Sequence, residues 1–256
     1  LHQLVSGQLD MDRMDYLNRD SFFTGVSEGV IGYDRIIKML AVHEGELVVE
    51  EKGIYSIEKF LIARRLMYWQ VYLHKTGVTA EQMLIHTLQR ARELALQGKE
   101  LEVPRHLGWF LYRKPGDAPS IDELMRHFTQ LDDTDITAAI KYWSEDSDLT
   151  LSWLSRGLLN RRLMRLEWHD YPISPEKIEQ VHKMVAAHFG SSAHLEHLVY
   201  FGSVSNRAYD ENTEQIKILF KNNRVCPISE CSDVPLFTKL VTKHFICYPK
   251  HLDSAS

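Results

Sequence analysis

The chain has 256 residues, of which 44% are hydrophobic and 25% are charged, and its net charge is -5 at pH 7. These values are typical of a globular protein that buries its own core, and they exclude a disordered or fibrous chain. The negative charge argues against a protein whose main partner is nucleic acid, and we find no strong nucleic-acid signal.

The three cysteines, Cys226, Cys231 and Cys247, form an odd and sparse set, which is typical of reduced thiols in a cytosol-like compartment. No apolar run approaches the ~20 residues that a membrane-spanning helix needs, and no secretory signal is recognisable. We therefore expect a cytoplasmic protein without a membrane partner. The first residue is Leu1 rather than methionine, and we expect the chain to be part of a longer protein.

The hydrophobic pattern predicts a mainly α-helical fold. Capping signals at Thr79, Ser120 and Ser174, and glycines at 98 and 190, bound several of the helices. The predicted helices are residues 10–20, 28–42, 57–75, 80–97, 120–129, 134–145, 149–168 and 175–189.

Two stretches depart from the helical pattern. Residues 46–55 predict a short β-hairpin that turns at Lys52-Gly53. Residues 199–201, 216–220 and 245–248 read as strands, with a turn at Asn222-Asn223 and a helix near 234–244. We therefore expect a helical body over residues 1–190, followed by a small α+β segment over residues 191–256.

The segment from Asp10 to Asp20 mixes acidic, basic and apolar residues. On a helix, Asp12, Tyr16 and Arg19 share one face, because residues three and four apart are neighbours. A carboxylate suits a hard cation, a guanidinium pairs with phosphate oxygens, and a phenol can reach a sugar or base. The alternative is a solvated helix face with ion pairs between successive turns.

A second segment, residues 64–75, places Arg64, Tyr68 and Tyr72 at a spacing of four residues. An arginine on an aromatic, mostly apolar face needs an anion or hydrogen-bond acceptors unless its head reaches water. The segment therefore predicts a pocket wall. The alternative is an arginine at the edge of the core that pairs with a local carboxylate.

The two segments resemble motifs of the HD-domain phosphohydrolases. Within that family they are most similar to the deoxynucleoside triphosphate triphosphohydrolase, or dGTPase-like, branch. Residues 10–20 match that family's pattern Asp-x-Asp-(Lys/Arg)-x-Asp-Tyr-x-x-Arg-Asp, and residues 64–75 match its Arg-x(7)-Tyr-x-His-Lys pattern. The resemblance implies a helical HD-domain body. It also implies metal-dependent hydrolysis of a deoxynucleoside triphosphate to nucleoside and triphosphate, by a homo-oligomer that is a dimer or tetramer.

The resemblance also implies roles for single residues. Asp12 would be a catalytic metal ligand, to Mg, Mn, Fe, Ni or Zn. The residues that would bind the substrate are Arg13 and Arg64 at the triphosphate, Tyr16 and Asp20 at the deoxyribose, and Tyr72 at the sugar or base. The residues that match a regulatory nucleotide site are His74, Lys75, Arg161 and Arg165.

One departure from the family concerns the metal ligands. The family places a histidine and a His-Asp pair before the segment that contains Asp12. In this chain no His-Asp pair precedes that segment, and His2 is too close to it to supply the pattern. We therefore expect the chain to be the C-terminal part of an HD enzyme, with the activity belonging to the full-length parent and the fragment alone inactive. The alternative is a catalytically idle nucleotide-sensing or oligomerisation protein with the same fold.

Overall fold

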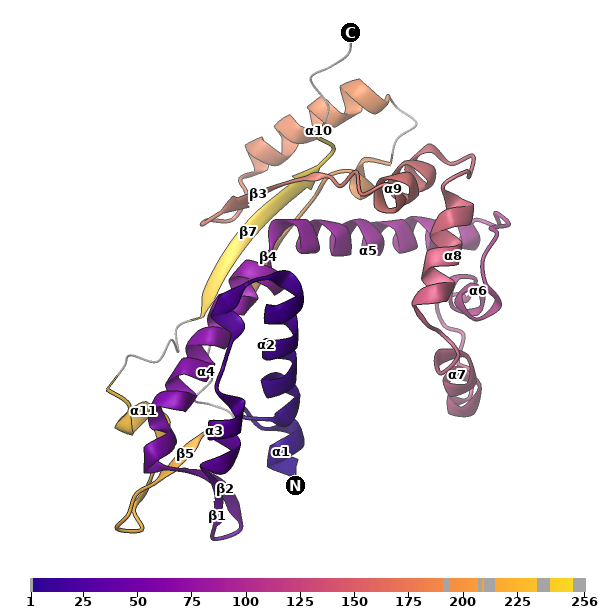
Figure 1. Ribbon diagram of the computed structural model, residues 1–256. Coiled ribbons are helices and arrows are strands. Elements are labelled where there is room, and N and C mark those ends of the chain that lie inside the picture. The colour runs from indigo at the N-terminus through magenta and orange to yellow at the C-terminus, as the bar shows by residue number, and fades with distance from the viewer. Residues whose placement is uncertain (1, 191–193, 207–208, 210–214, 234–239, 251–256) are drawn as a thin grey trace. The chain divides into compact units, whose positions relative to one another are not determined.

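The computed structural model describes residues 2–190, 194–206, 209, 215–233 and 240–250 (Figure 1). The chain forms two compact units, the first made of residues 1–74 and 204–242 and the second of residues 75–203 and 243–256. This division differs from the expected one at residue 190, because residues 204–242 pack with the beginning of the chain. Strands β4 (Tyr200–Asn206) and β7 (Val241–Tyr248) each run from one unit into the other.

The first unit is built on two helices, α2 and α4, that lie side by side (Figure 1). Its helical elements are α1 (His2–Ser6), α2 (Met11–Thr24), η1 (Ser27–Gly29), α3 (Tyr33–Lys38), η2 (Glu51–Gly53), α4 (Ile54–Met67), the π-helix η3 (Tyr68–Tyr72) and α11 (Ile228–Cys231). Leu17 of α2 and Phe60 and Met67 of α4 are wholly buried in the shared core. These apolar contacts fix the faces that the two helices turn to one another.

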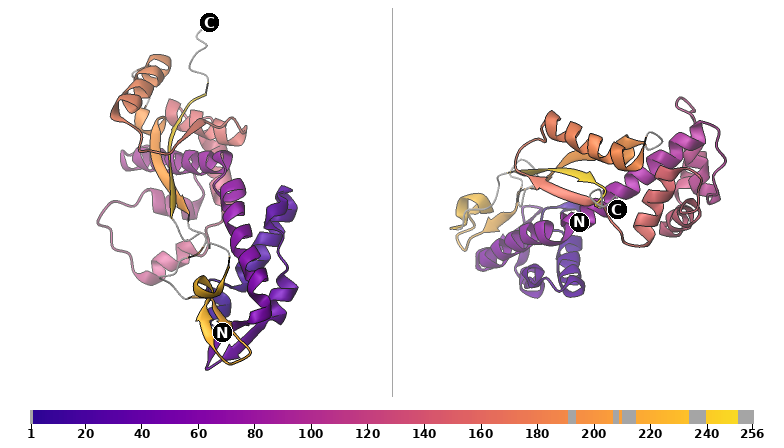
Figure 2. Two further views of the ribbon diagram at one scale, coloured as in Figure 1. Left: turned by 90° about the vertical axis from the view of Figure 1, so that its left-hand side faces the viewer. Right: turned by 90° about the horizontal axis from the view of Figure 1, so that it is seen from above.

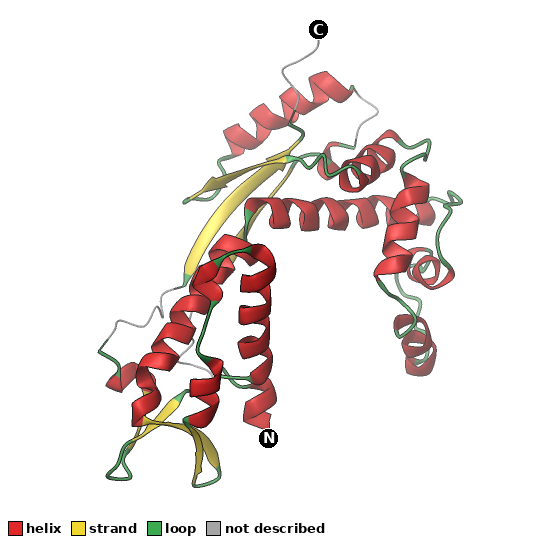
Figure 3. Ribbon diagram, in the orientation of Figure 1, coloured by secondary structure: helices red, strands yellow, loops and turns green. Residues whose placement is uncertain are grey.

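A four-stranded sheet completes the first unit (Figure 3). Its strands are β1 (Leu40–His43), β2 (Glu46–Glu50), β5 (Lys217–Leu219) and β6 (Val225–Pro227), in that order across the sheet. β1 and β2 form an antiparallel hairpin, and β2 pairs in parallel with β5 through Val49 and Ile218. This parallel pair ties the late residues of the chain to the first unit.

The hairpin was expected at residues 46–55 and lies instead at residues 40–50. Its turn is formed by Glu44 and Gly45, which both have positive φ, 50° and 81°. Two positive φ values match the twist of a two-residue hairpin turn, and glycine adopts them without steric cost. Residues 51–53, where the turn was predicted, form the helical turn η2.

The second unit is a helical layer next to a three-stranded sheet. Its helical elements are α5 (Lys75–Leu96), α6 (Arg105–Leu111), α7 (Ile121–Phe128), α8 (Asp133–Trp143), α9 (Leu149–Leu159), α10 (Pro175–Phe189) and η4 (Leu195–His197). α5 and α8 both pack against α9 (Figures 1 and 2). The sheet has the order β3-β7-β4, and β3 (Arg165–His169) pairs antiparallel with β7. In the described part of the chain, no helix is both long and apolar enough to cross a bilayer.

Local capping signals were largely confirmed. Ser120 and Ser174 accept hydrogen bonds from the third residue of α7 and α10, and Gly190 ends α10 with a positive φ. Asn223 also has a positive φ, in the turn between β5 and β6. Thr79 was wrongly predicted as a cap, because α5 begins at Lys75 and the Thr79 hydroxyl donates to the Lys75 carbonyl.

Three predicted helices were wrong in extent, and three short helices were missed. The helix predicted over 28–42 is confined to residues 33–38, because residues 40–43 pair as β1. The helix predicted over 149–168 ends at Leu159, and β3 follows. Of the helix predicted near 234–244, residues 234–239 lie outside the described residues and 241–244 belong to β7. The short helices α1, α6 and α11 were not predicted.

Candidate active site

Helix α2 carries the charged segment, and Asp10, the first aspartate of that segment, caps its N-terminus. The Asp10 carboxylate accepts a hydrogen bond from the Arg13 amide at 2.7 Å, as a helix N-cap does. The Arg13 guanidinium turns back to donate to the Gly7 carbonyl at 2.5 Å and lies 3.4 Å from the Asp10 carboxylate. Asp12 is exposed on the first turn, where the helix dipole favours a carboxylate.

The two motifs meet at a hydrogen bond between a phenol and a carboxylate. The Tyr72 hydroxyl donates to the Asp20 carboxylate at 2.7 Å, although the two residues are 52 positions apart. The Tyr72 ring makes edge-on contacts with Tyr16 at 5.7 Å and with Tyr68 at 5.2 Å between ring centroids. We call Tyr16, Asp20, Tyr68 and Tyr72 the tyrosine cluster.

A π-helical turn shapes this cluster. At the end of α4 the backbone continues as the π-helix η3, and the Leu73 amide donates to the Tyr68 carbonyl five residues earlier at 2.7 Å. π-Helical turns are rare in proteins, but those that occur often lie at functional sites. They redirect side chains that a regular helix would hold in one row. Here the turn carries both Tyr68 and Tyr72.

Burial favours the protonated form of two phenols of the cluster, Tyr16 and Tyr72. It is the main cause that raises the pKa of Tyr16, and the neighbouring Tyr68 adds to it. Burial also raises the pKa of Tyr72, together with its hydrogen bond to Asp20. A phenol that stays neutral is a hydrogen-bond donor at any physiological pH, so Tyr72 holds the Asp20 carboxylate in a fixed orientation.

Arg64 stands next to the cluster. Its guanidinium carbon lies 5.8 Å from the centre of the Tyr68 ring, a cation–π distance, and its charge acts on Tyr16. The structure therefore brings together four of the predicted substrate residues, Tyr16, Asp20, Arg64 and Tyr72. Tyr68 joins them, although it was predicted only as a member of the helix face.

The described residues do not complete a metal site around Asp12. Within them, one group of three His, Cys, Asp or Glu ligand atoms lies within 4.8 Å, and it consists of Glu93, Glu196 and His197 in the second unit. The Arg90 guanidinium lies 3.0 Å from Glu93, and His197 contacts the same carboxylate oxygen at 2.9 Å. An arginine already neutralises that carboxylate, so the group is better explained as an ionic network than as a metal site.

Of the residues predicted for a regulatory nucleotide, three belong to the second unit, and no hydrogen bond or ion pair among its described residues joins Lys75, Arg161 and Arg165. His74 and Lys75 are exposed, where α5 begins. Arg161 follows α9 with a φ of 55°, and Arg165 in β3 pairs with Glu167 at 3.2 Å. Their regulatory role stays a prediction.

Comparison with known proteins gives the family context. Residues 31–103 match the family described as the HD associated region. A phosphohydrolase from Bacteroides thetaiotaomicron of known crystal structure is similar, with 47% identity and a TM-score of 0.90 over 97% of this chain and 63% of its own. A SAMHD1 homolog from Dictyostelium discoideum, described as a deoxynucleoside triphosphate triphosphohydrolase, is 29% identical over 38% of this chain and 19% of its own length. These matches support the assignment of the chain to the HD phosphohydrolase superfamily.

A further relative covers nearly the whole chain. The uncharacterized protein YwfO of Bacillus subtilis is 29% identical over 97% of this chain and 57% of its own length. The chain thus spans less than two thirds of the length of YwfO and of the Bacteroides structure. Activity, substrate and partners of the whole protein are therefore matters of proposal.

Proposed function

We propose that the whole protein is a metal-dependent phosphohydrolase of the HD superfamily that converts a deoxynucleoside triphosphate to deoxynucleoside and inorganic triphosphate. The observation that carries the proposal is the hydrogen bond from Tyr72 to Asp20, since it unites the two motifs in one cluster. The likeness to the Bacteroides phosphohydrolase and to the Dictyostelium homolog supports the same reaction class.

The cluster has the groups that such a substrate needs. Arg64 can pair with phosphate oxygens through two parallel N–H donors, which suits a group of high negative charge. The Asp20 carboxylate, oriented by Tyr72, can accept a hydrogen bond from a sugar hydroxyl. The edges and faces of Tyr16 and Tyr68 offer apolar surface to the deoxyribose or base.

In the proposed reaction a water oxygen bonds to the α-phosphorus and the bond from that phosphorus to the 5′-oxygen breaks. The 5′-oxygen takes up a proton and leaves as the deoxynucleoside, while the triphosphate keeps the oxygen of the water. Asp12 is proposed as one metal ligand of the whole protein. Because the described residues do not complete a metal site, no step of the reaction is assigned to them through a metal.

The reaction is tested by incubating the whole protein with manganese and each of the four deoxynucleoside triphosphates. Anion-exchange chromatography should show triphosphate and nucleoside in equal amounts, and ¹⁸O from labelled water should appear only in the triphosphate. Monophosphate with pyrophosphate, or orthophosphate, would place the cleaved bond elsewhere and contradict the proposal. No product with any nucleotide, alone or in mixtures, would favour the idle nucleotide-sensing protein.

Variants of two arginines separate binding from folding. Arg64→Ala should raise KM for the triphosphate substrate by about 10- to 100-fold, as loss of a charge-assisted hydrogen bond does. Arg35→Ala is the matched control, because Arg35 is exposed in the same unit and donates to the Lys52 carbonyl outside the cluster. Equal effects of the two substitutions would show that Arg64 is structural.

The predicted homo-oligomer, whether dimer or tetramer, also stays a proposal. Light scattering of the whole protein at micromolar concentration tests it directly. A strictly monomeric mass would contradict it, and would also weaken the regulatory role predicted for His74 and Lys75.

A further inference from the structure

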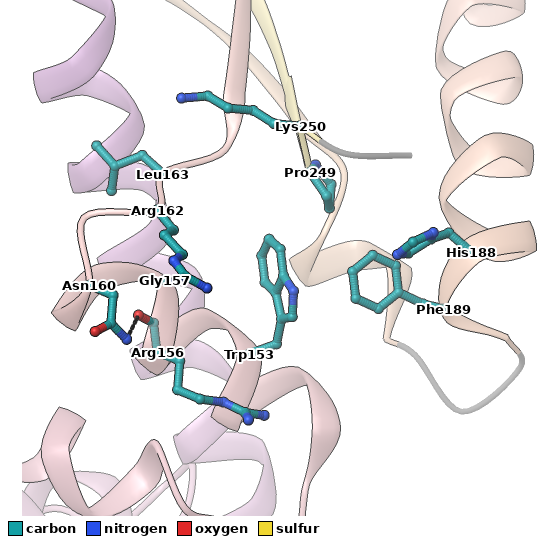
Figure 4. Close-up of a pocket in the computed structure, with 10 residues that line it drawn as sticks. All are labelled: Trp153, Arg156, Gly157, Asn160, Arg162, Leu163, His188, Phe189, Pro249 and Lys250. Atoms are coloured by element: carbon teal, nitrogen blue, oxygen red, sulfur yellow. Dashed lines mark hydrogen bonds between the residues drawn. The ribbon is translucent and has the colours of Figure 1, made fainter. Parts of the chain in front are cut away.

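The second unit contains a cavity that none of the predicted site residues lines. Its volume is about 630 Å³, within the ~300–1,000 Å³ that small-molecule sites occupy. Residues from the end of α9, from the following loop, from the end of α10 and from the segment after β7 surround it (Figure 4). The side chains that define its chemistry are Trp153, Arg156, Arg162, His188, Phe189 and Lys250.

The lining is basic. Arg156, Arg162 and Lys250 carry permanent positive charge, His188 adds a titratable ring, and among the described residues neither aspartate nor glutamate lines the cavity. Within the described part of the chain, no carboxylate forms an ion pair with any of the three cations, and the Arg156 guanidinium donates only to Ser152. Like charges gathered without a counter-charge repel one another, so an anionic ligand would be stabilised here.

The lining is also aromatic. The Trp153 and Phe189 rings meet edge to face with centroids 5.4 Å apart, and His188 meets Phe189 in the same way at 5.0 Å. Figure 4 shows the Trp153 indole standing between the Arg162 guanidinium on one side and Phe189 on the other. A flat ring system can stack on such a face while an attached anion reaches the arginine.

The backbone that carries the two arginines is folded back on itself. The Arg162 amide donates to the Gly157 carbonyl at 2.8 Å, which folds the loop back onto the end of α9. A Cβ added at Gly157 would lie 2.8 Å from the end of the Met83 side chain and 3.2 Å from the Arg162 carbonyl, so a larger residue there would require its neighbours to shift. The backbone that carries Arg156 and Arg162 is therefore closely packed, while both side chains are exposed.

We propose that this cavity is a binding site for a mononucleotide, whose base stacks on Trp153 and whose phosphates lie on Arg162, Arg156 and Lys250. The inference does not depend on the proposed function, since the tyrosine cluster belongs to the first unit and the cavity to the second. Loss of one site leaves the argument for the other unchanged.

The test is isothermal titration of the full chain with ATP in the presence of EDTA, on an Arg64→Ala background that weakens the other candidate site. ATP should bind with micromolar affinity and quench fluorescence, and Trp153→Phe should remove most of the quenching. Arg162→Glu should weaken ATP at least 10-fold. Arg105→Glu, which makes the same change of charge at an exposed residue of α6, should alter the affinity less than 2-fold.

Two further probes read the base and the phosphates separately. Adenosine and inorganic triphosphate should each bind at least 10-fold more weakly than ATP, and Trp153→Ala should make ATP bind no better than triphosphate. Triphosphate that binds as tightly as ATP would overturn the nucleotide assignment in favour of a simple anion site. Equal losses from Arg162→Glu and Arg105→Glu, or no binding at all, would overturn the site itself.

Discussion

A buried ion pair lies at the start of α9, and the structure predicts how its loss would change the free energy of unfolding. Arg90 of α5 donates from Nε to Asp148 Oδ1 at 3.2 Å and from its terminal nitrogen to Oδ2 at 2.7 Å. The Arg90 side chain is only 4% exposed. Asp148 also caps α9, since the Leu151 amide donates to it at 2.8 Å. α9 in turn carries Trp153 and other residues of the basic cavity.

Two substitutions at Asp148 separate the ion pair from the cap. Breaking a buried pair costs ~3–5 kcal/mol, and the low end applies because Glu93 still pairs with Arg90 at 3.0 Å. Loss of an N-cap adds ~1 kcal/mol. Asp148→Ala should therefore lower the free energy of unfolding by ~4 kcal/mol. Asp148→Asn keeps a capping oxygen, so its cost should be ~3 kcal/mol.

The assay is urea unfolding, with hydrogen exchange of the α9 amides as a local readout. The chain offers a matched control in Asp15→Ala, because Arg19 donates to Asp15 in the same two-bonded geometry, at 2.9 and 3.0 Å, but on the surface. An exposed pair contributes little, and no change is expected there. Equal effects of Asp15→Ala and Asp148→Ala would refute the reasoning from burial.

The same pair predicts a pH dependence. Burial alone would raise the pKa of Asp148, but the hydrogen bonds from Arg90 and the Leu151 amide outweigh it and lower that pKa below its ordinary value. The stabilisation is therefore complete above the unfolded pKa of ~3.9 and is lost as the pH falls through the folded value. The stability difference between wild type and Asp148→Asn should shrink below about pH 4. A difference that stays constant to pH 2.5 would contradict this.

Two further changes test the electrostatics of each unit. Tyr72→Phe removes the hydrogen bond to Asp20 and should lower the free energy of unfolding in urea by ~1 kcal/mol, whereas Tyr55→Phe, at an exposed tyrosine of α4, should have no effect. Burial, and then the neighbouring His197, lower the pKa of His86 from 6.5 to about 4, so stability should be lost as the pH falls through that interval. An NMR titration that finds His86 protonated at pH 6 would contradict that expectation.

The local features of the fold were predictable because they depend on residues close together in the sequence. Ser120 caps α7 through the amide of Glu123, and Ser174 with Pro175 starts α10, as their spacing indicated. The extent of several elements was not predictable. Residues 165–169 continue an apolar pattern that suits a helix, but they pair with β7, whose residues lie about eighty positions later. Pairing of that kind overrides local propensity.

The candidate site also has features that the sequence predicted and features that only the tertiary structure decided. The sequence alone placed the Asp10–Asp20 segment on a helix and put Arg64, Tyr68 and Tyr72 near one another, because side chains about four residues apart share a helix face. Only the tertiary structure decided that Tyr72 donates to Asp20, since that bond requires α4 to pack on α2. The π-helix at Tyr68–Tyr72 had no recognised signal in the sequence.

The basic cavity shows most clearly which features could not be predicted from the sequence. Arg156 and Arg162 are close in sequence, but the spacing gives no reason to join them to Phe189 or Lys250. What the sequence determined by itself was the set of capped helices and the two motifs, because hydrogen bonds between near neighbours encode them. The grouping of residues 204–242 with the first unit, the tyrosine cluster and the cavity were decided by tertiary packing, because they rest on contacts between segments whose separation in sequence carries no local signal.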